Sequence, residues 1–135
     1  MPRDEFSITC SDREGYRLIR VDIPTTVEIG RLSVAAATYI SMFVDDRAIV
    51  VLNDATELVS LDQDVQEVLL AMLRRNVTRP TFVGSAWITR DNPQLDDLLR
   101  RLLVIADRDP DSVFATENEA MAYLHGLLES ESGGI

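Results

Sequence analysis

Lysine is missing from this sequence of 135 residues, and cysteine and histidine occur once each. A zinc site built from cysteine and histidine needs several such ligands and is therefore nearly excluded. A receiver-type phospho-acceptor domain needs a lysine late in the chain, and the sequence has none to supply. A single cysteine cannot form an intrachain disulfide, which agrees with a cytoplasmic protein.

The glycine motifs that bind phosphates or expose a nucleophile are also missing. The six glycines are scattered, so there is no P-loop, no GxGxxG and no GxSxG. Cys10 lies on the apolar side of a predicted strand and is expected in the core. His125 lies near the end of the last predicted helix and is expected at the surface. We therefore expect no catalytic residue, no cofactor, no bound metal and no enzymatic activity.

Basic residues are outnumbered by acidic ones, 13 against 23, which gives a formal net charge of −10. Nucleic acid and anionic membrane surfaces need cationic patches, so neither is expected as a main partner. Long apolar runs are missing as well, since the longest candidate, residues 32–44, is shorter than the roughly 18 residues of a membrane helix. Residues 1–4 are polar, which predicts no signal peptide, and we expect no membrane insertion.

The sequence does contain alternating strand and helix patterns. Residues 5–10 and 16–23 alternate polar and apolar side chains around the polar stretch 11–15, which predicts an antiparallel hairpin. Further strands are predicted at residues 47–53, 81–89 and 112–115. The run from Ile49 to Leu52 is apolar on both faces, as in a buried parallel strand.

Four helices are predicted around these strands. A capping box at Thr25 to Glu28 predicts a first helix over residues 26–44; the alternative is a strand that continues to residue 29, with the helix beginning at Ser33. Residues 62–76 form the clearest helix, with acids near its start and arginines near its end. Asn92 followed by proline starts the third helix, and a second capping box at residues 116–119 starts the last.

The resulting order is β-β-α-β-α-β-α-β-α. It predicts an α/β fold with a mixed sheet, a parallel core and an antiparallel N-terminal strand. We expect a single domain over residues 3–129 and a flexible tail over residues 130–135.

The stretch of residues 47–64 is predicted to be the centre of the molecule, because function in α/β sheets gathers at the carboxyl ends of the strands. Its carboxylates are candidates for a magnesium site, and the structural alternative is a solvated loop with acids at a helix start. Ser60 has two interpretations, the N-cap of the next helix or a regulatory phosphorylation site. The candidate partner-binding residues are Asn53, Asp54, Glu57, Ser60, Asp62 and Asp64.

Three runs together carry a resemblance to a known family: residues 26–28, residues 49–54, and residues 113–124. With these runs in this order and spacing, residues 6–128 resemble the STAS and SpoIIAA-like domains of the bacterial anti-sigma-factor antagonists. They are most similar to the divergent STAS/SEC14 type. Family members carry an Asp-Ser-Ser-Gly type motif, with a phosphorylated serine, at the start of the helix after the central strand.

This chain departs from that motif, because residues 59–64 read VSLDQD and Ser60 lies a residue or two early. Asp62 and Asp64 supply negative charge where phosphate would bring it. The resemblance thus implies a phospho-switch that is lost or fixed in a charged state.

The resemblance implies a non-catalytic regulatory domain that binds a protein partner through the loop of residues 53–64 and its helix. That partner would be an anti-sigma-type kinase or another regulator. The alternative is a SEC14-like carrier of a lipid or small apolar ligand, bound in a pocket between helices and sheet. A homodimer is expected if Tyr39, Met42 or Phe43 is exposed on the first helix.

Overall fold

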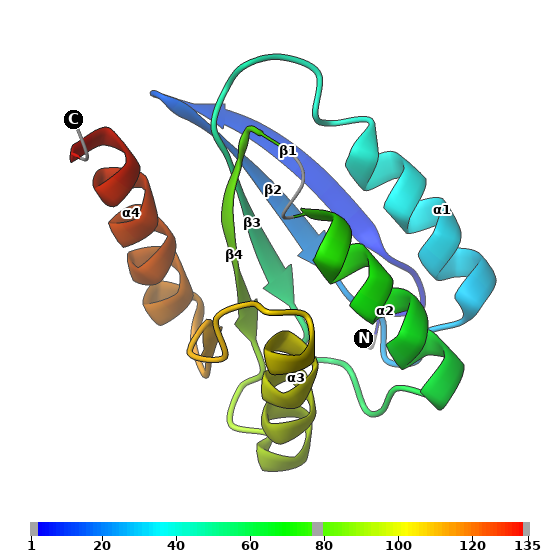
Figure 1. Ribbon diagram of the computed structural model, residues 1–135. Helices are drawn as coiled ribbons and strands as arrows, with labels where there is room; N and C mark the ends of the chain where they lie inside the picture. Colours follow the sequence, from blue (N-terminus) through cyan, green and yellow to red (C-terminus); the bar gives the residue numbers. More distant parts are fainter. Residues whose placement is uncertain (1–2, 77–79, 134–135) are drawn as a thin grey trace.

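The computed structural model describes residues 3–76 and 80–133, which form a five-stranded sheet with helices on both faces (Figure 1). The strands are β1 (Ser7–Arg13), β2 (Tyr16–Asp22), β3 (Ile49–Asp54), β4 (Phe82–Ile88) and β5 (Val113–Phe114). The helices are α1 (Ile29–Ile40), α2 (Gln63–Asn76), α3 (Pro93–Ile105) and α4 (Glu117–Gly133). The predicted α/β class and element order are confirmed.

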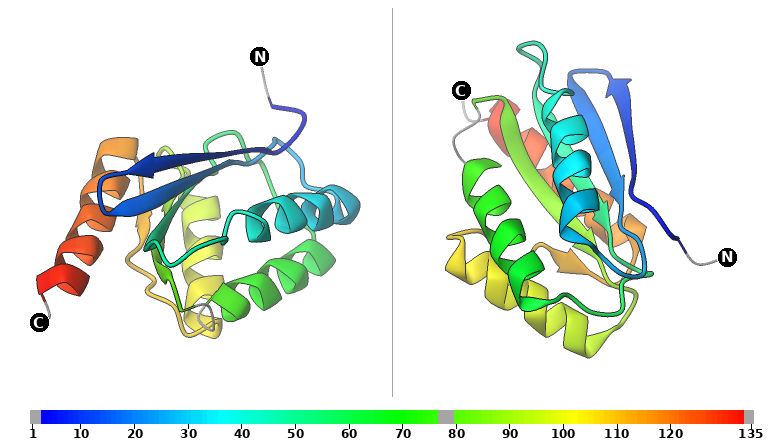
Figure 2. Two further views of the ribbon diagram at one scale, coloured as in Figure 1. Left: turned by 90° about the horizontal axis from the view of Figure 1, so that it is seen from above. Right: turned by 90° about the vertical axis from the view of Figure 1, so that its right-hand side faces the viewer.

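Strand order in the sheet follows the chain, from β1 through β5. β1 pairs antiparallel with β2, and every later neighbour pairs parallel, as predicted. Successive parallel crossovers in one direction place their helices on the same face. Accordingly, α1, α2 and α3 cover one face and α4 lies on the other (Figure 2).

β3 is the central strand, and all six of its residues are buried. Val50 and Leu52 pack on the α4 side with Leu124. Ile49 and Val51 pack on the opposite side, in a cluster with Tyr39 of α1. Because side chains alternate along a strand, a strand covered on both faces needs apolar residues at consecutive positions.

The hairpin of β1 and β2 is longer than predicted. Pairing continues to Arg13 opposite Tyr16, so the turn is Glu14-Gly15, and Gly15 has a φ of 85° that favours glycine. The predicted loop over residues 11–15 was therefore too wide. Cys10 is exposed, and its prediction as a core residue was wrong because β1 is an edge strand with little helix cover.

α1 begins at Ile29 and not at residue 26, so the first predicted capping box was wrong. Glu28 occupies the N-cap position and makes no side-chain cap bond. The Thr25 hydroxyl donates instead to the backbone carbonyl of Arg3 at 3.2 Å. The Thr25 hydroxyl, which the sequence pattern predicted to cap the helix, thus bonds to the N-terminal segment.

The predicted condition for a homodimer is not met on α1. Tyr39 is buried, and Met42 and Phe43 are half-buried behind the end of the helix. The rings of Tyr39 and Phe43 lie edge to face, with centroids 5.1 Å apart. These aromatic residues belong to the core on this side of the sheet.

Two helix starts are as predicted. Asn92 Oδ1 accepts a hydrogen bond from Leu95 N at 3.2 Å and caps α3. Thr116 Oγ1 accepts from Glu119 N at 3.3 Å and donates to the Glu119 carboxylate at 2.9 Å, so α4 begins with a capping interaction.

α4 packs against β4 at Gly84, where an added Cβ would meet Leu127. The helix continues to Gly133 and so includes residues 130–133 of the predicted tail; residues 134 and 135 lie outside the described residues. Within the described ranges, no helix is both long and apolar enough to cross a bilayer.

Candidate functional site at the carboxyl edge of the sheet

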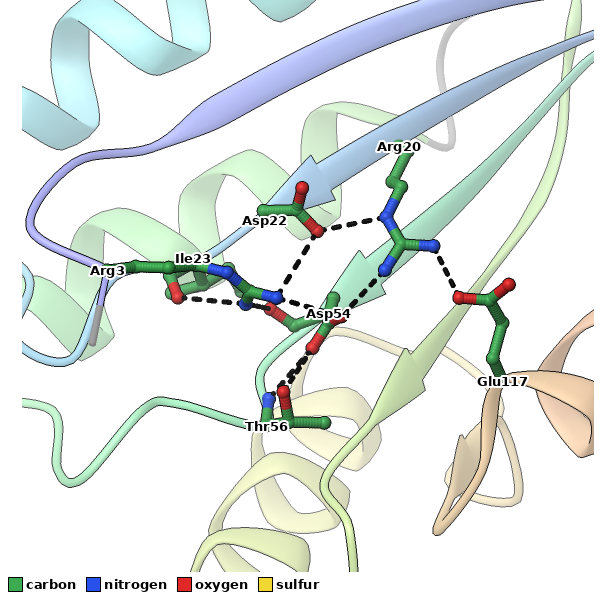
Figure 3. A network of polar contacts seen from close by, with 7 residues as sticks. All are labelled: Arg3, Arg20, Asp22, Ile23, Asp54, Thr56 and Glu117. Carbon is green, nitrogen blue, oxygen red and sulfur yellow. Dashed lines mark hydrogen bonds and ion pairs between the residues drawn. The ribbon is translucent and has the colours of Figure 1, made fainter. Parts of the chain in front are cut away.

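A network of charged side chains lies where β2 and β3 end (Figure 3). Arg20 and Asp22 come from β2, Asp54 ends β3, and Arg3 reaches the group from the segment before β1. Glu117, at the start of α4, pairs with Arg20 from the other side. Segments that are distant in sequence thus meet at one edge of the sheet.

Asp54 is the centre of this network. Its Oδ2 accepts from Arg20 Nη2 at 2.7 Å and from Arg3 Nη2 at 3.1 Å. Its Oδ1 accepts from Thr56 N at 3.0 Å and from Thr56 Oγ1 at 2.7 Å. The side chain is only 8 % exposed, so four donors satisfy a nearly buried carboxylate.

The protonation equilibria in the network favour charged groups. Burial of the Asp54 carboxyl would raise its pKa, but hydrogen bonds from Thr56 and Arg3 outweigh burial and hold the pKa below its ordinary value. Burial would lower the pKa of Arg20, but pairing with Glu117 and Asp22 outweighs it and raises that pKa. The ion pair of Asp54 with Arg20 thus stabilises the charged form of both groups.

This arrangement connects separate parts of the chain. Each carboxylate oxygen of Asp54 already accepts two hydrogen bonds. Arg3 also donates to the carbonyl of Asp54 at 3.3 Å, which joins the N-terminal segment to the end of β3. Among the described residues, no three or more His, Cys, Asp or Glu side chains are grouped so as to hold a metal ion. We therefore read the network as a structural clasp.

The structure separates the predicted partner-binding residues into two sets. Asn53 and Asp54 are buried on opposite faces of the sheet. Glu57 is half-buried, whereas Ser60, Asp62 and Asp64 are exposed. The last three are thus accessible near the start of α2, whereas the first two lie inside the molecule.

Ser60 is not the N-cap of α2, so that interpretation was wrong. The helix begins at Gln63, and its first hydrogen bond runs from Gln66 N to Asp62 O at 2.9 Å, which puts Asp62 in the capping position. Ser60 lies two residues earlier and is exposed. An acid competes well for an N-cap, because its carboxylate also interacts with the positive end of the helix.

The loop between β3 and α2 is held by backbone hydrogen bonds. Ala55 N donates to Ile88 O at 2.9 Å, and Val59 N donates to Thr25 O at 3.0 Å. Leu58 is 3 % exposed and packs in the core beneath the loop. These contacts hold the loop from Ala55 to Val59, and the side chain of Val59 is 66 % exposed.

A second feature lies on the α1 side of the sheet, where a cavity of about 70 Å³ separates β3 and β4 from α1 and α2. Its walls are mostly apolar, and the residues with polar atoms are Asn53, Ser85 and Trp87 of the two strands and Tyr39 of α1. Trp87 is 3 % exposed, and its Nε1 is buried with no hydrogen-bond partner among the described residues.

Sequence reasoning missed most members of both features. The two-residue spacing of Arg20 and Asp22 on one face of β2 was the available signal for the network. No local pattern pointed to Arg3 or Glu117, which join the network only through tertiary structure. For the cavity, the signal was the single tryptophan of the chain within a predicted strand.

Comparison with known proteins gives no family assignment: no protein-family model matches the chain, and no curated protein matches it significantly.

Proposed function

We propose that this chain is a non-catalytic interaction domain of the regulatory kind and binds a protein partner. The contact surface is the end of the loop before α2 together with the first turn of that helix. Its residues are Val59, Ser60, Asp62 and Asp64, which we call the acidic surface. The resemblance to anti-sigma-factor antagonists supports this proposal, since it implies binding at the same part of the fold.

The observation that carries the proposal is the rigid presentation of this surface. The loop is held by backbone hydrogen bonds and by buried Leu58, yet it exposes Val59 a few residues before the exposed carboxylates of Asp62 and Asp64. A pre-ordered surface loses little conformational freedom when a partner binds. An exposed valine beside Asp62 suits a partner that offers an apolar contact surrounded by basic residues.

Phosphorylation of Ser60 would act on the same surface. The hydroxyl is exposed, and a phosphate there would add negative charge close to the start of α2. Asp62 and Asp64 already provide charge in this region, so we propose that the acidic form is the binding form. Phosphopeptide mapping of the protein from native cells tests whether a kinase phosphorylates Ser60 and so adds to this negative charge.

The test of the proposal is a quantitative pull-down from lysate of the source cells with the wild-type chain and two variants. The first carries Asp62→Arg and Asp64→Arg, and the control carries Glu14→Arg and Glu129→Arg. All four residues are exposed, and both variants change the net charge equally. We expect the first variant to lose a partner that the wild type and the control retain. Equal recovery of every partner by all three proteins would contradict the proposal.

A further inference from the structure

Buried polar side chains line the cavity on the α1 side. Asn53 and Ser85 are 9 % and 7 % exposed, and both line the cavity beside Trp87. Buried polar side chains in an otherwise apolar wall are the usual means by which a small-molecule site fixes the orientation of its ligand. This cavity is separate from the acidic surface.

The indole N–H of Trp87 is the clearest sign of a missing partner. Its nitrogen is buried, and no described residue accepts its hydrogen bond. A buried donor without an acceptor is destabilising, and such groups are rare in folded proteins. An acceptor on a bound molecule would remove this cost, whereas a tryptophan needed only for packing could be replaced by phenylalanine.

The inner cavity lies next to an outer groove. Phe6, Ile8 and Ala35 line both the cavity and an outer groove of about 490 Å³ between the N-terminal segment and α1. Phe6 borders a third, smaller space beneath Trp87 as well. Its half-buried side chain thus borders the inner cavity and the outer groove. A ligand longer than the inner cavity can extend past Phe6 into the groove.

The lining restricts the charge of the ligand. The described residues that line the inner cavity include no charged side chain. A carboxylate or an ammonium group in this space would lose its hydration without gaining an opposite charge, at a large free-energy cost. A neutral acceptor needs only the hydrogen bonds that Trp87, Asn53 and Ser85 can offer.

We propose that this cavity binds a small, neutral, mostly apolar molecule with one polar end, such as a ketone or an alcohol. The acceptor atom lies inward and takes the hydrogen bond of Trp87 Nε1. The apolar end lies among the side chains of α1 and α2 and extends past Phe6. This binding activity is independent of the protein contact made by the acidic surface.

The single tryptophan makes a direct test possible, because a ¹H–¹⁵N spectrum of the whole chain contains one indole signal. We expect titration with 2-hexanone to move the indole proton downfield in a saturable manner. We expect n-hexane, at its solubility limit, and hexanoate to leave that proton in place, because the first has no acceptor and the second is charged. An indole signal that 2-hexanone leaves unchanged, or that hexanoate moves equally, would overturn the proposal. So would a water-to-indole NOE that persists at the highest ketone concentration, since a water would then occupy the site.

Two leucine variants of α1 provide the matched control. Ala36 lines the cavity, whereas Ala37 is exposed and lines none of the cavities described above. We expect Ala36→Leu to weaken 2-hexanone binding by roughly tenfold or more, because the added carbons occupy the ligand space. Ala37→Leu should bind like the wild type. Equal affinity of the two variants would contradict the assigned location, and the wild-type titration decides the proposal even if Ala36→Leu does not fold.

Discussion

At the scale of single residues, Asp54 shows how a nearly buried charge becomes part of the frame. Two arginines and Thr56 donate to its carboxylate, and these donors come from three separate segments. Removing one partner of a buried ion pair leaves the other charge desolvated and unpaired. This destabilises the protein more than replacing the whole pair with apolar residues does.

We predict that Asp54→Asn lowers the free energy of unfolding by roughly 2–4 kcal/mol, because an amide presents a donor to two guanidinium groups. Urea denaturation measures the loss. The control is Asp46→Asn, an exposed aspartate for which we expect a change within about 0.5 kcal/mol. A similar effect of both substitutions would show that the clasp adds little to stability.

The same carboxylate predicts a pH dependence. Its pKa in the folded protein lies below the ordinary value, so its contribution to stability is complete above about pH 4 and is lost as the pH falls through the folded pKa. We expect the stability difference between wild type and Asp54→Asn to shrink in acid. Urea denaturation at a series of pH values from neutral to acidic checks this, and a constant difference would contradict the assignment.

At the scale of elements, local sequence predicts some helix starts correctly, whereas tertiary contacts change others. Asn92 and Thr116 cap their helices as their sequence patterns predict. The pattern at Thr25 fails because the hydroxyl bonds to Arg3, which is distant in sequence. The pattern at Ser60 fails because α2 begins only at Gln63, which leaves Asp62 at the N-cap position.

These assignments predict a contrast between two alanine variants. Asn92→Ala should destabilise the protein by about 1 kcal/mol, the usual cost of losing an N-cap side chain. Ser60→Ala should change stability by less than about 0.5 kcal/mol, because this exposed side chain is no cap. Thermal or urea denaturation of both variants measures these changes. A larger loss of stability for Ser60→Ala than for Asn92→Ala would contradict the assignment of Asp62 to the N-cap position of α2.

At the scale of the whole molecule, the two faces of the sheet are covered unequally. Three helices cover one face, and α4 alone packs on the other, against β4 and β5 (Figure 2). Leu124 is fully buried in the cluster between α4 and β3. The cover of this face therefore depends on a few side chains of a single helix.

We predict that Leu124→Ala lowers the free energy of unfolding by roughly 2–5 kcal/mol, as for other large-to-small core changes. It should also increase binding of a hydrophobic dye, because a loosened α4 uncovers apolar residues of β3 and β4. Glu129→Ala, on the exposed side of the same helix, should do neither. Equal dye binding by both variants would show that the sheet face does not depend on this contact.

Periodicity was enough to predict the fold class, because alternation and helical spacing are local properties of the chain. Val50 and Leu52 could be placed in a central strand from their apolar neighbours alone. The exposure of Cys10 could not be predicted, because it depends on the edge position of β1. The clasp at Asp54 and the cavity beside Trp87 depend on contacts between distant segments, which no local pattern contains.

The order of the strands has a consequence for how the protein is made. Because the sheet is built in chain order, no strand has to be inserted between two that are already paired. Each later strand instead pairs at an edge of the sheet formed by the strands before it. Most pairings then join neighbouring units, which shortens the loops that must close. Because α4 follows all five strands in the chain, its face of the sheet can be covered only after every strand has been synthesised.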